Sequence, residues 1–214
     1  MRALGRVTGA VHHGLIFGRR VRALADHIAA MIPAATRTVL DVGCGDGSLA
    51  TLIMRRRPEL RIVGLEVRAR PMTAIPVTEF DGRSIPLESA SQDVVMMVDV
   101  LHHAEDGQLL LREAARVASK AVVIKDHFLG RALSRQRLRA MDWVGNVGHG
   151  VALPYNYWTR DQWRTGFEQS GLMEVERHEH LGLYPPPLSW IFEPGLHFVS
   201  RLTRVSDEPS APRG

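Results

Sequence analysis

The sequence predicts an α/β protein with a doubly wound, mostly parallel sheet, and three observations support this fold class. Short apolar runs typical of buried parallel strands recur along the chain, the clearest being Val94–Val98. Segments with helical spacing of apolar residues separate these runs, which is the pattern of βαβ units with right-handed crossovers. A glycine-rich turn, Gly43–Gly47, joins the first run to a helix, as in folds that bind ligands at the carboxyl ends of their strands.

The elements follow in order along the chain. A helix with one apolar stripe from Phe17 to Ile32 comes first and ends at Pro33. Strands are expected at 38–42, 61–66, 77–80, 94–98, 121–124, 172–179 and 196–204, which makes seven. Helices are expected at 48–57, around 110–118, and from a Thr159 cap to about residue 170. Prolines limit any helix in the crossover after Glu66 to one or two turns.

Composition and charge narrow the class of protein. The single cysteine, Cys44, rules out an intramolecular disulfide and favours a reducing, cytoplasmic setting. No apolar stretch approaches the roughly 20 residues that a transmembrane helix needs. The net charge is +4, but the arginines are spread along the chain without interleaved aromatics, so solvated helix faces are favoured over nucleic-acid binding. The ten histidines show no metal-ligand spacing, and no metal is expected.

The glycine-rich turn carries the first chemical signal. Its sequence, D-V-G-C-G-D-G over Asp41–Gly47, lets the backbone turn sharply and approach a ligand without β-carbons. Asp41 and Asp46 would repel a pyrophosphate, whereas a ligand with an ammonium and a sulfonium suits them. Glu66 ends the next strand, roughly 20 residues after the glycines, where a carboxylate can accept both hydroxyls of a ribose.

These motifs resemble a known family. Val39–Gly47 is similar to the first motif of class I S-adenosylmethionine (SAM)-dependent methyltransferases, which have a Rossmann-like fold. Gly64–Glu66, Phe80–Gly82 and Ser91–His103 resemble later motifs of the subgroup that includes many small-molecule methyltransferases (type 11-like). The resemblance covers Thr38–Asp126 and implies SAM as the cofactor. It also implies a seven-stranded sheet with helices on both faces and an antiparallel last strand.

The resemblance assigns cofactor-binding roles on the methionine side of SAM. Gly43, Gly45 and Gly47 approach the methionine part, and Cys44 belongs to the same loop as a packing residue rather than a nucleophile. Asp41 orients the loop and reaches the ammonium through water.

Further roles on the adenosine and methyl sides come from the same resemblance. Glu66 holds the ribose, and Asp81 with Gly82 meets the adenine amino group. The segment Asp99, Val100 and Leu101 passes beneath the transferable methyl. Val67 and Ile85 flank the adenine ring. Two alternatives stay open: Asp81 can belong to an ordinary Asp-Gly turn, and Asp99 can cap the next loop instead of lining the pocket.

Candidate catalytic and substrate-binding residues lie on the ligand side of the sheet. His102, His103 and His127 are candidate general bases, with packed loop histidines as the alternative. The aromatic segment 146–158 offers donors, acceptors and ring walls for the methyl acceptor. Its candidate acceptor residues are His149, Tyr155, Asn156 and Tyr157, and the alternative is packing against the following helix.

The sequence thus predicts one methyltransferase domain over 1–205, with a helical cap (1–33), a cofactor-binding half (38–126) and a substrate-side half (127–205). A polar tail, 206–214, is expected to be disordered. The expected reaction is methyl transfer from SAM to an O, N or C atom of a small, possibly apolar molecule by a monomer or homodimer. The competing hypotheses are a non-catalytic SAM-binding protein and a nicotinamide-dependent oxidoreductase.

Overall fold

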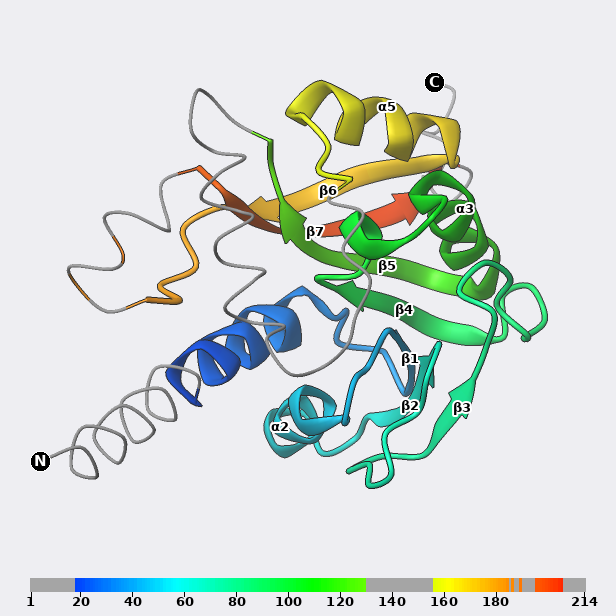
Figure 1. Ribbon diagram of the computed structural model, residues 1–214, viewed down its shortest axis with the longest axis vertical. Coiled ribbons are helices and arrows are strands. Elements are labelled where there is room, and N and C mark those ends of the chain that lie inside the picture. The colour runs from blue at the N-terminus through cyan, green and yellow to red at the C-terminus, as the bar shows by residue number, and fades with distance from the viewer. Residues whose placement is uncertain (1–17, 130–155, 185, 187–188, 190–194, 206–214) are drawn as a thin grey trace, which may run out of the picture.

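The computed structural model describes residues 18–129, 156–184, 186, 189 and 195–205. Its centre is a seven-stranded sheet with the strand order β3-β2-β1-β4-β5-β7-β6, and helices lie on both faces (Figure 1). The expected fold class is confirmed: the sheet is mostly parallel, and its last strand runs antiparallel to its neighbours.

The strands are β1 (Thr38–Val42), β2 (Arg61–Glu66), β3 (Val77–Glu79), β4 (Gln92–Val98), β5 (Ala118–His127), β6 (Leu172–His178) and β7 (His197–Arg204). Neighbours among the first five strands are parallel, so their carboxyl ends share one edge. Because β7 is antiparallel to β5, its first residues meet the end of β5, and His197 is paired with His127.

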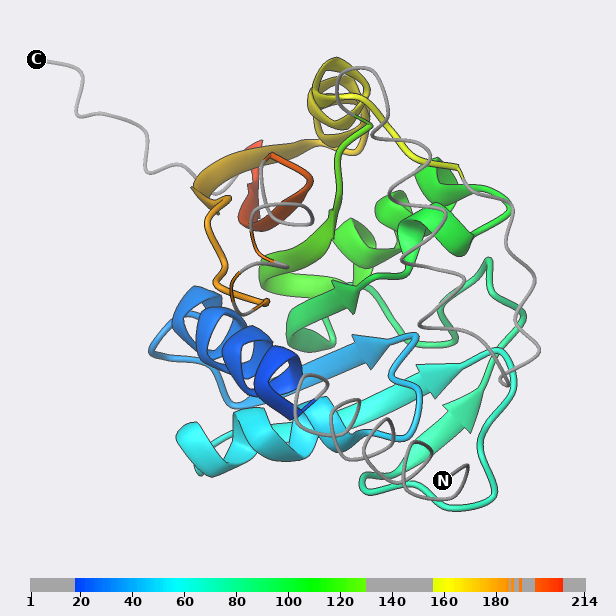
Figure 2. The same cartoon turned by 60° about the vertical axis from the view of Figure 1, so that its left-hand side comes forward.

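Helical layers cover both faces of the sheet. The N-terminal helix, residues 18–31 in the described part, lies beside α2 (Ser48–Arg56) on one face (Figure 2). On the other face lie α3 (Gly107–Val117) and α5 (Arg160–Gln169), and a short 3-10 helix, η1 (Leu101–His103), follows β4.

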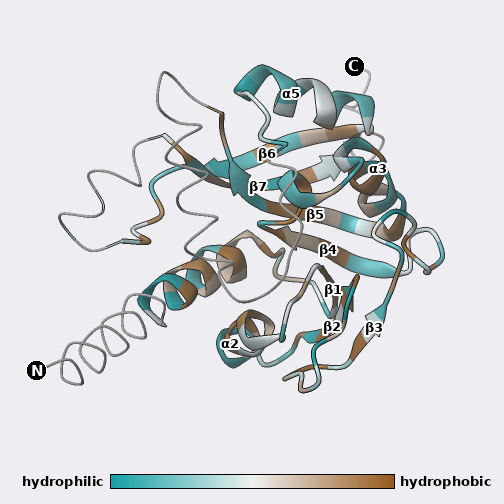
Figure 3. Ribbon diagram, in the orientation of Figure 1, coloured by the Kyte–Doolittle hydropathy of each residue, from teal (hydrophilic) through white to brown (hydrophobic). Residues whose placement is uncertain are grey.

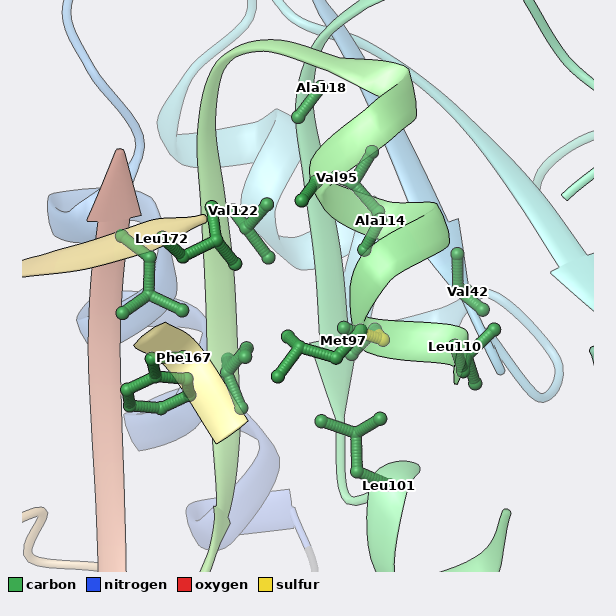
Figure 4. Close-up of a cluster of buried hydrophobic side chains, with 14 of the residues drawn as sticks. Val42, Val95, Met97, Leu101, Leu110, Ala114, Ala118, Val122, Phe167 and Leu172 are labelled. Atoms are coloured by element: carbon green, nitrogen blue, oxygen red, sulfur yellow. The ribbon is translucent and has the colours of Figure 1, made fainter. Parts of the chain in front are cut away.

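Alternating residues of the central strands face two separate cores. On β4, Val95 and Met97 pack with residues of α3 and α5, whereas Val94 and Met96 pack with residues of the N-terminal helix and α2. Figure 4 shows the first of these cores, where side chains of α3 and α5 meet β4 and β5. Each of the four β4 side chains is at most 1% exposed, which explains the continuous apolar run in the sequence.

The helix α5 is fixed at the carboxyl end of β5. The predicted cap is confirmed: Thr159 and Gln162 form a capping box at the start of the helix. Trp163 donates its Nε1–H to the carbonyl oxygen of His127 at 3.0 Å. Most residues of α5 are hydrophilic (Figure 3), since only the side of the helix that carries Trp163 and Phe167 is buried.

The structure adds detail at the crossover after Glu66 and corrects the bounds of β5. The crossover, where the prolines allow at most one or two helical turns, holds no helix over residues 67–76, and neither does the crossover over 80–91. The first of these segments bonds instead to the glycine loop, with Ala74 N–H donating to the Asp46 carbonyl at 2.8 Å. β5 runs from Ala118 to His127 instead of 121–124, because its polar last residues find buried partners. No described helix is both long enough and apolar enough to cross a bilayer.

Candidate active site

The glycine loop between β1 and α2 has a backbone that only glycine adopts readily. Gly43, Gly45 and Gly47 have φ values of 72°, 59° and 76°. A β-carbon at Gly43 would lie 2.6 Å from Cγ2 of Val100, and one at Gly47 would lie 2.6 Å from Cγ1 of Ile75. The loop therefore packs against the segment after β4 on one side and against the β2–β3 crossover on the other.

Glu66, at the end of β2, closes onto this loop. Its Oε2 accepts the N–H of Gly45 at 2.8 Å, and its Oε1 accepts the N–H of Val67 at 3.0 Å. The guanidinium of Arg70 approaches the same place, with Nη2 3.6 Å from where a β-carbon of Gly45 would stand and Nη1 3.9 Å from Oδ2 of Asp46. A carboxylate and a guanidinium thus flank the amides of the loop.

Asp41 and Cys44 are the buried members of the loop region. Asp41 is 2% exposed, and burial together with the negative charge of Glu66 raises its pKa to about 8. Burial, with Asp41 and Glu66 nearby, raises the pKa of the Cys44 thiol to about 12. Cys44 packs against Gly64 of β2, as expected of a packing residue, and its protonated thiol is no nucleophile.

The predicted adenine side is open. Asp81 is exposed, and its Oδ1 accepts the N–H groups of Arg83 and Ser84 at 2.8 and 2.7 Å, which is the geometry of a local Asp-Gly turn. Gly82 follows with φ 76°, and Val67 beside it is 60% exposed. Ile85 lies inside the core on the α3 side at 2% exposure. The local turn accounts for one oxygen of Asp81, so an adenine contact remains a prediction.

Asp99 begins the segment that follows β4, and it is held between two cations. Its φ of 58° is a left-handed value, and its N–H donates to the Lys125 carbonyl at 2.8 Å. Its carboxylate is bonded by Nζ of the fully buried Lys125 and by Nη2 of Arg20 at 3.2 Å. Burial opposes ionisation of Asp99, but Lys125 and Arg20 hold its pKa below the usual range. Asp99 is thus an ionised anchor of the segment Asp99–Leu101.

The candidate bases lie next to Asp126. Nδ1 of His102 is 2.6 Å from Oδ1 of Asp126, which also accepts the N–H of His127 at 2.8 Å. His102, Asp126 and His127 are each at most 2% exposed. Nδ1 of His127 is 3.4 Å from Asp126 and 3.5 Å from Asp99, and burial and the charge of Lys125 lower the pKa of His127 well below its usual value.

Aromatic rings surround these groups. The ring of His102 lies 3.9 Å from that of His103 and stacks on that of Tyr157 at 5.5 Å, while His197 lies 4.7 Å from His127. Asn156 joins the same place, since its N–H donates to the His102 carbonyl at 3.1 Å. Tyr157 and Asn156 are therefore brought to the candidate bases, whereas His149 and Tyr155 lie outside the described residues.

The neighbouring Trp158 has a different place. Its ring packs on Trp163 at 4.7 Å, and a β-carbon at Gly166 would lie 2.7 Å from it. The aromatic segment thus divides: Trp158 packs against α5, as the alternative interpretation expected, and Tyr157 faces the histidines.

The structure also brings together a group that the sequence spacing did not show. One ligand atom each of Asp99, His102, Asp126 and His127 lie within 4.8 Å of one another. The charges there are already balanced, because Lys125 and Arg20 match the two carboxylates and occupy both oxygens of Asp99. A divalent cation would add two uncompensated charges in a buried place, so this arrangement favours an ion-paired network over a metal centre.

Sequence reasoning missed several residues of this network. Lys125 and Asp126 follow the apolar run 121–124, and a K-D-H triplet ending a buried strand is itself a usable signal, since such groups are costly to bury without partners. Arg20, Arg70 and His197 carried no such signal, because only the tertiary structure brings them to the site.

Comparison with known proteins bears on the same part of the chain. Residues 40–124 match a family model described as a methyltransferase domain. A curated relative, the 27-O-demethylrifamycin SV methyltransferase of Amycolatopsis mediterranei, is 28% identical over 188 residues. The match covers 78% of this chain and 65% of the relative, so this chain spans less than two thirds of that relative's length.

Solved structures share the fold. A chain from the complex of the Haloferax volcanii Trm112 methyltransferase activator with a methyltransferase superposes with a TM-score of 0.66 at 16% identity, covering 89% of this chain and 94% of that one. A SAM-dependent methyltransferase of Mesorhizobium loti gives a TM-score of 0.60 at 20% identity, covering 82% and 94%. At these identities the likeness shows the fold alone.

Proposed function

We propose that this class I SAM-dependent methyltransferase transfers the methyl group of SAM to an oxygen, nitrogen or carbon atom of a small, partly apolar molecule. The observation that carries the proposal is the acid-edged glycine loop at the carboxyl end of β1. With the acidic residues Asp46 and Glu66 beside it, the loop disfavours a phosphorylated dinucleotide and suits a nucleoside that bears positive charge.

The residues present fit the methionine part of SAM. Gly43, Gly45 and Gly47 have positive φ values, which glycine adopts readily, and they place no β-carbon of their own beside the loop amides. Arg70 offers a positive charge for the carboxylate of the ligand, and the buried carboxyl of Asp41 offers an oxygen that can accept a hydrogen bond from its ammonium. Bound SAM supplies an electrophilic methyl group on a sulfonium, and the chain aligns the acceptor with it.

The adenosine and methyl sides of the cofactor site are proposed on the same edge. Glu66 holds the ribose, from the position where it now accepts loop amides. Val67, Asp81 and Gly82 border the adenine. The segment Asp99–Leu101 is proposed to lie beneath the transferable methyl, and the close approach of Val100 to Gly43 supports this.

The acceptor is proposed to lie on the histidine side of this edge. Tyr157 and Asn156, which contact His102, supply a wall and a polar contact there, and His149 and Tyr155 are proposed partners from outside the described residues. A base is required only where the acceptor must lose a proton, and His102, His103 and His127 are the candidates. The relative named for a rifamycin derivative supports a small-molecule acceptor.

The remaining parts of the proposal concern the whole chain. They are the division into helical cap, cofactor-binding half and substrate-side half, a cytoplasmic location, and a monomer or homodimer that acts on no nucleic acid. The free thiol of Cys44 is consistent with a reducing compartment.

Calorimetry and methyl transfer together test the function. We expect SAM and its demethylated product to bind, with no binding of NAD. We expect radiolabelled methyl groups to appear in the metabolite fraction of a cell extract. Label confined to RNA or protein would refute the small-molecule acceptor. Binding of NAD without SAM would establish the oxidoreductase alternative, and SAM binding without label in any fraction would favour a non-catalytic SAM-binding protein.

A further inference from the structure

The buried pair of His102 and Asp126 has the arrangement of a base and its orienting carboxylate. We propose that Asp126 is a positioning residue that makes His102 the general base, and that the acceptor atom is therefore a hydroxyl oxygen. This inference rests on the proposed methyl transfer; it selects one among the three candidate histidines and a hydroxyl oxygen over an amine nitrogen as the acceptor.

The first argument is the tautomer of His102. Asp126 is ionised, since its pairing with His102 lowers its pKa even though burial opposes this, and an ionised carboxylate only accepts hydrogen bonds. The 2.6 Å contact therefore places the proton of neutral His102 on Nδ1 and makes Nε2 the basic nitrogen. The carboxylate cannot turn away freely, because the same oxygen accepts the backbone N–H of His127.

The second argument is the distribution of charge around His102. Asp99 is bonded to the two nearby cations, Lys125 and Arg20, which leaves Asp126 as the carboxylate that contacts the His102 ring. A proton gained on Nε2 would place a positive charge in a buried site, and Asp126 compensates it at contact distance. The titratable groups that lie around His102 are Asp99, His103, Asp126, His127 and Tyr157; Lys125 and Arg20 are bonded to Asp99, and His197 lies beside His127.

The third argument is that the other two histidines lack this support. His103 has a buried Nδ1 without a hydrogen-bond partner among the described residues, and burial with His102 beside it lowers its pKa to about 4. Nδ1 of His127 lies 3.4 Å from Asp126 and 3.5 Å from Asp99 without a hydrogen bond to either, and burial together with the charge of Lys125 lowers its pKa well below the usual value. Among the three candidates, His102 is the one with a carboxylate oxygen at hydrogen-bond distance from its ring, and this contact stabilises its protonated form.

The acceptor class follows from what a base contributes. A neutral amine attacks through its lone pair and can lose its proton afterwards, whereas a neutral hydroxyl is a weak nucleophile until its proton is removed. As the acceptor oxygen forms its bond to the methyl carbon, the carbon–sulfur bond breaks and its electron pair stays on sulfur, which becomes a neutral thioether. The hydroxyl proton passes to Nε2 of His102 and then to solvent.

The tautomer can be measured without any acceptor. In nitrogen-15 spectra of the full chain with S-adenosylhomocysteine, we expect His102 to carry its proton on Nδ1, and we expect Asp126→Asn to remove that preference. Signals lost in His102→Gln identify the ring. Asp93→Asn is the matched control, because Asp93 accepts backbone N–H groups of Arg37 and Thr38 at the other end of β4. A proton on Nε2 in the parent protein, or an unchanged tautomer in Asp126→Asn, would overturn the positioning role.

The acceptor atom is tested with pairs of small aromatic compounds that differ only in a hydroxyl or an amino group. We expect methylation of the phenols, a kcat that falls about 100-fold or more in Asp126→Asn with little change in KM, and a pH–rate profile that loses the limb on which the rate rises as the base is deprotonated. Transfer to the anilines at the rate of the phenols, or to neither compound by a protein that binds SAM, would overturn the hydroxyl assignment. A protein that fails to bind SAM would instead refute the proposed function, while the tautomer measurement still reports on Asp126.

Discussion

Asp41 gives a prediction in which stability and ligand binding move in opposite directions. Its carboxyl is buried beside Glu66, and its pKa in the folded protein rises to about 8 from 3.8. Folding therefore favours the protonated form, so the stability associated with Asp41 is fully present below about pH 4 and is lost as the pH rises toward 8. Asp41→Asn keeps the shape of the side chain and removes this loss.

The magnitude follows from the size of the shift. One pKa unit corresponds to about 1.4 kcal/mol, so between pH 5 and pH 8 the advantage of Asp41→Asn over the parent should grow by up to ~4 kcal/mol. Relaxation around a buried charge reduces such effects, and we expect about 2 kcal/mol or more. That is a large part of the 5–15 kcal/mol that is usual for a domain.

Urea unfolding followed by circular dichroism at pH 5, 6, 7 and 8 measures this difference. Asp46→Asn is the matched control: Asp46 lies in the same loop with its side chain 47% exposed, and it accepts the N–H of Ser48 at 2.9 Å. Asparagine keeps an oxygen that can accept this N–H, so Asp46→Asn should change stability by less than about 1 kcal/mol, with no trend over this pH range. Parallel stability curves for Asp41→Asn and the parent would refute the buried, protonated carboxyl. Calorimetry should in turn show weaker SAM binding by Asp41→Asn.

Further predictions follow from the same contacts. Gly43→Ala should destabilise the fold by about 1–3 kcal/mol and weaken SAM binding at least tenfold, since alanine strains a φ of 72° and meets Val100; equal binding in calorimetry would contradict the loop assignment. Lys125→Met should destabilise the protein by about 3 kcal/mol in urea, because Asp99 loses its buried partner; a neutral effect would mean that Arg20 alone suffices. Methyl transfer should be unchanged after treatment with EDTA, since Lys125 and Arg20 already balance Asp99 and Asp126; loss of activity that Mg²⁺ or Mn²⁺ restores would reverse this. Trp163→Phe should lower stability by about 1–3 kcal/mol through the unpaired His127 carbonyl, and an unchanged melting temperature would argue against that bond as an anchor of α5.

The sequence predicts the buried parallel strands well and the irregular segments poorly. β1 and β2 begin and end where expected, because an apolar run bounded by charged residues or glycine leaves little choice of register. The crossover after Glu66 lacked such a pattern. Its backbone bonds to the glycine loop, as at Ala74, and this is a tertiary contact that local propensity does not contain.

The end of β5 shows a different limit of sequence reasoning. Lys125, Asp126 and His127 read as the polar residues that terminate a strand, yet the strand continues and buries all three. Their burial is possible because Asp99 and His102 arrive from the neighbouring strand to pair with them. Hydrophobic periodicity predicts the burial of apolar residues. It does not predict the burial of polar residues that are stabilised by ion pairs and hydrogen bonds.

The residues proposed to bind the cofactor and those proposed to act on the acceptor come from different parts of the sheet edge. The family match spans residues 40–124 and so includes the glycine loop and His102, but it stops immediately before Lys125 and Asp126. The β4–β5 register pairs Val98 with Lys125, which brings His102 to Asp126, and the antiparallel β7 adds His197 opposite His127. Likeness to known methyltransferases therefore supports the cofactor side, whereas the choice of base and acceptor depends on residues that only the sheet topology brings together. Substitutions at Asp126 and at the glycine loop should accordingly separate methyl transfer from SAM binding, since each group serves one side of the same edge.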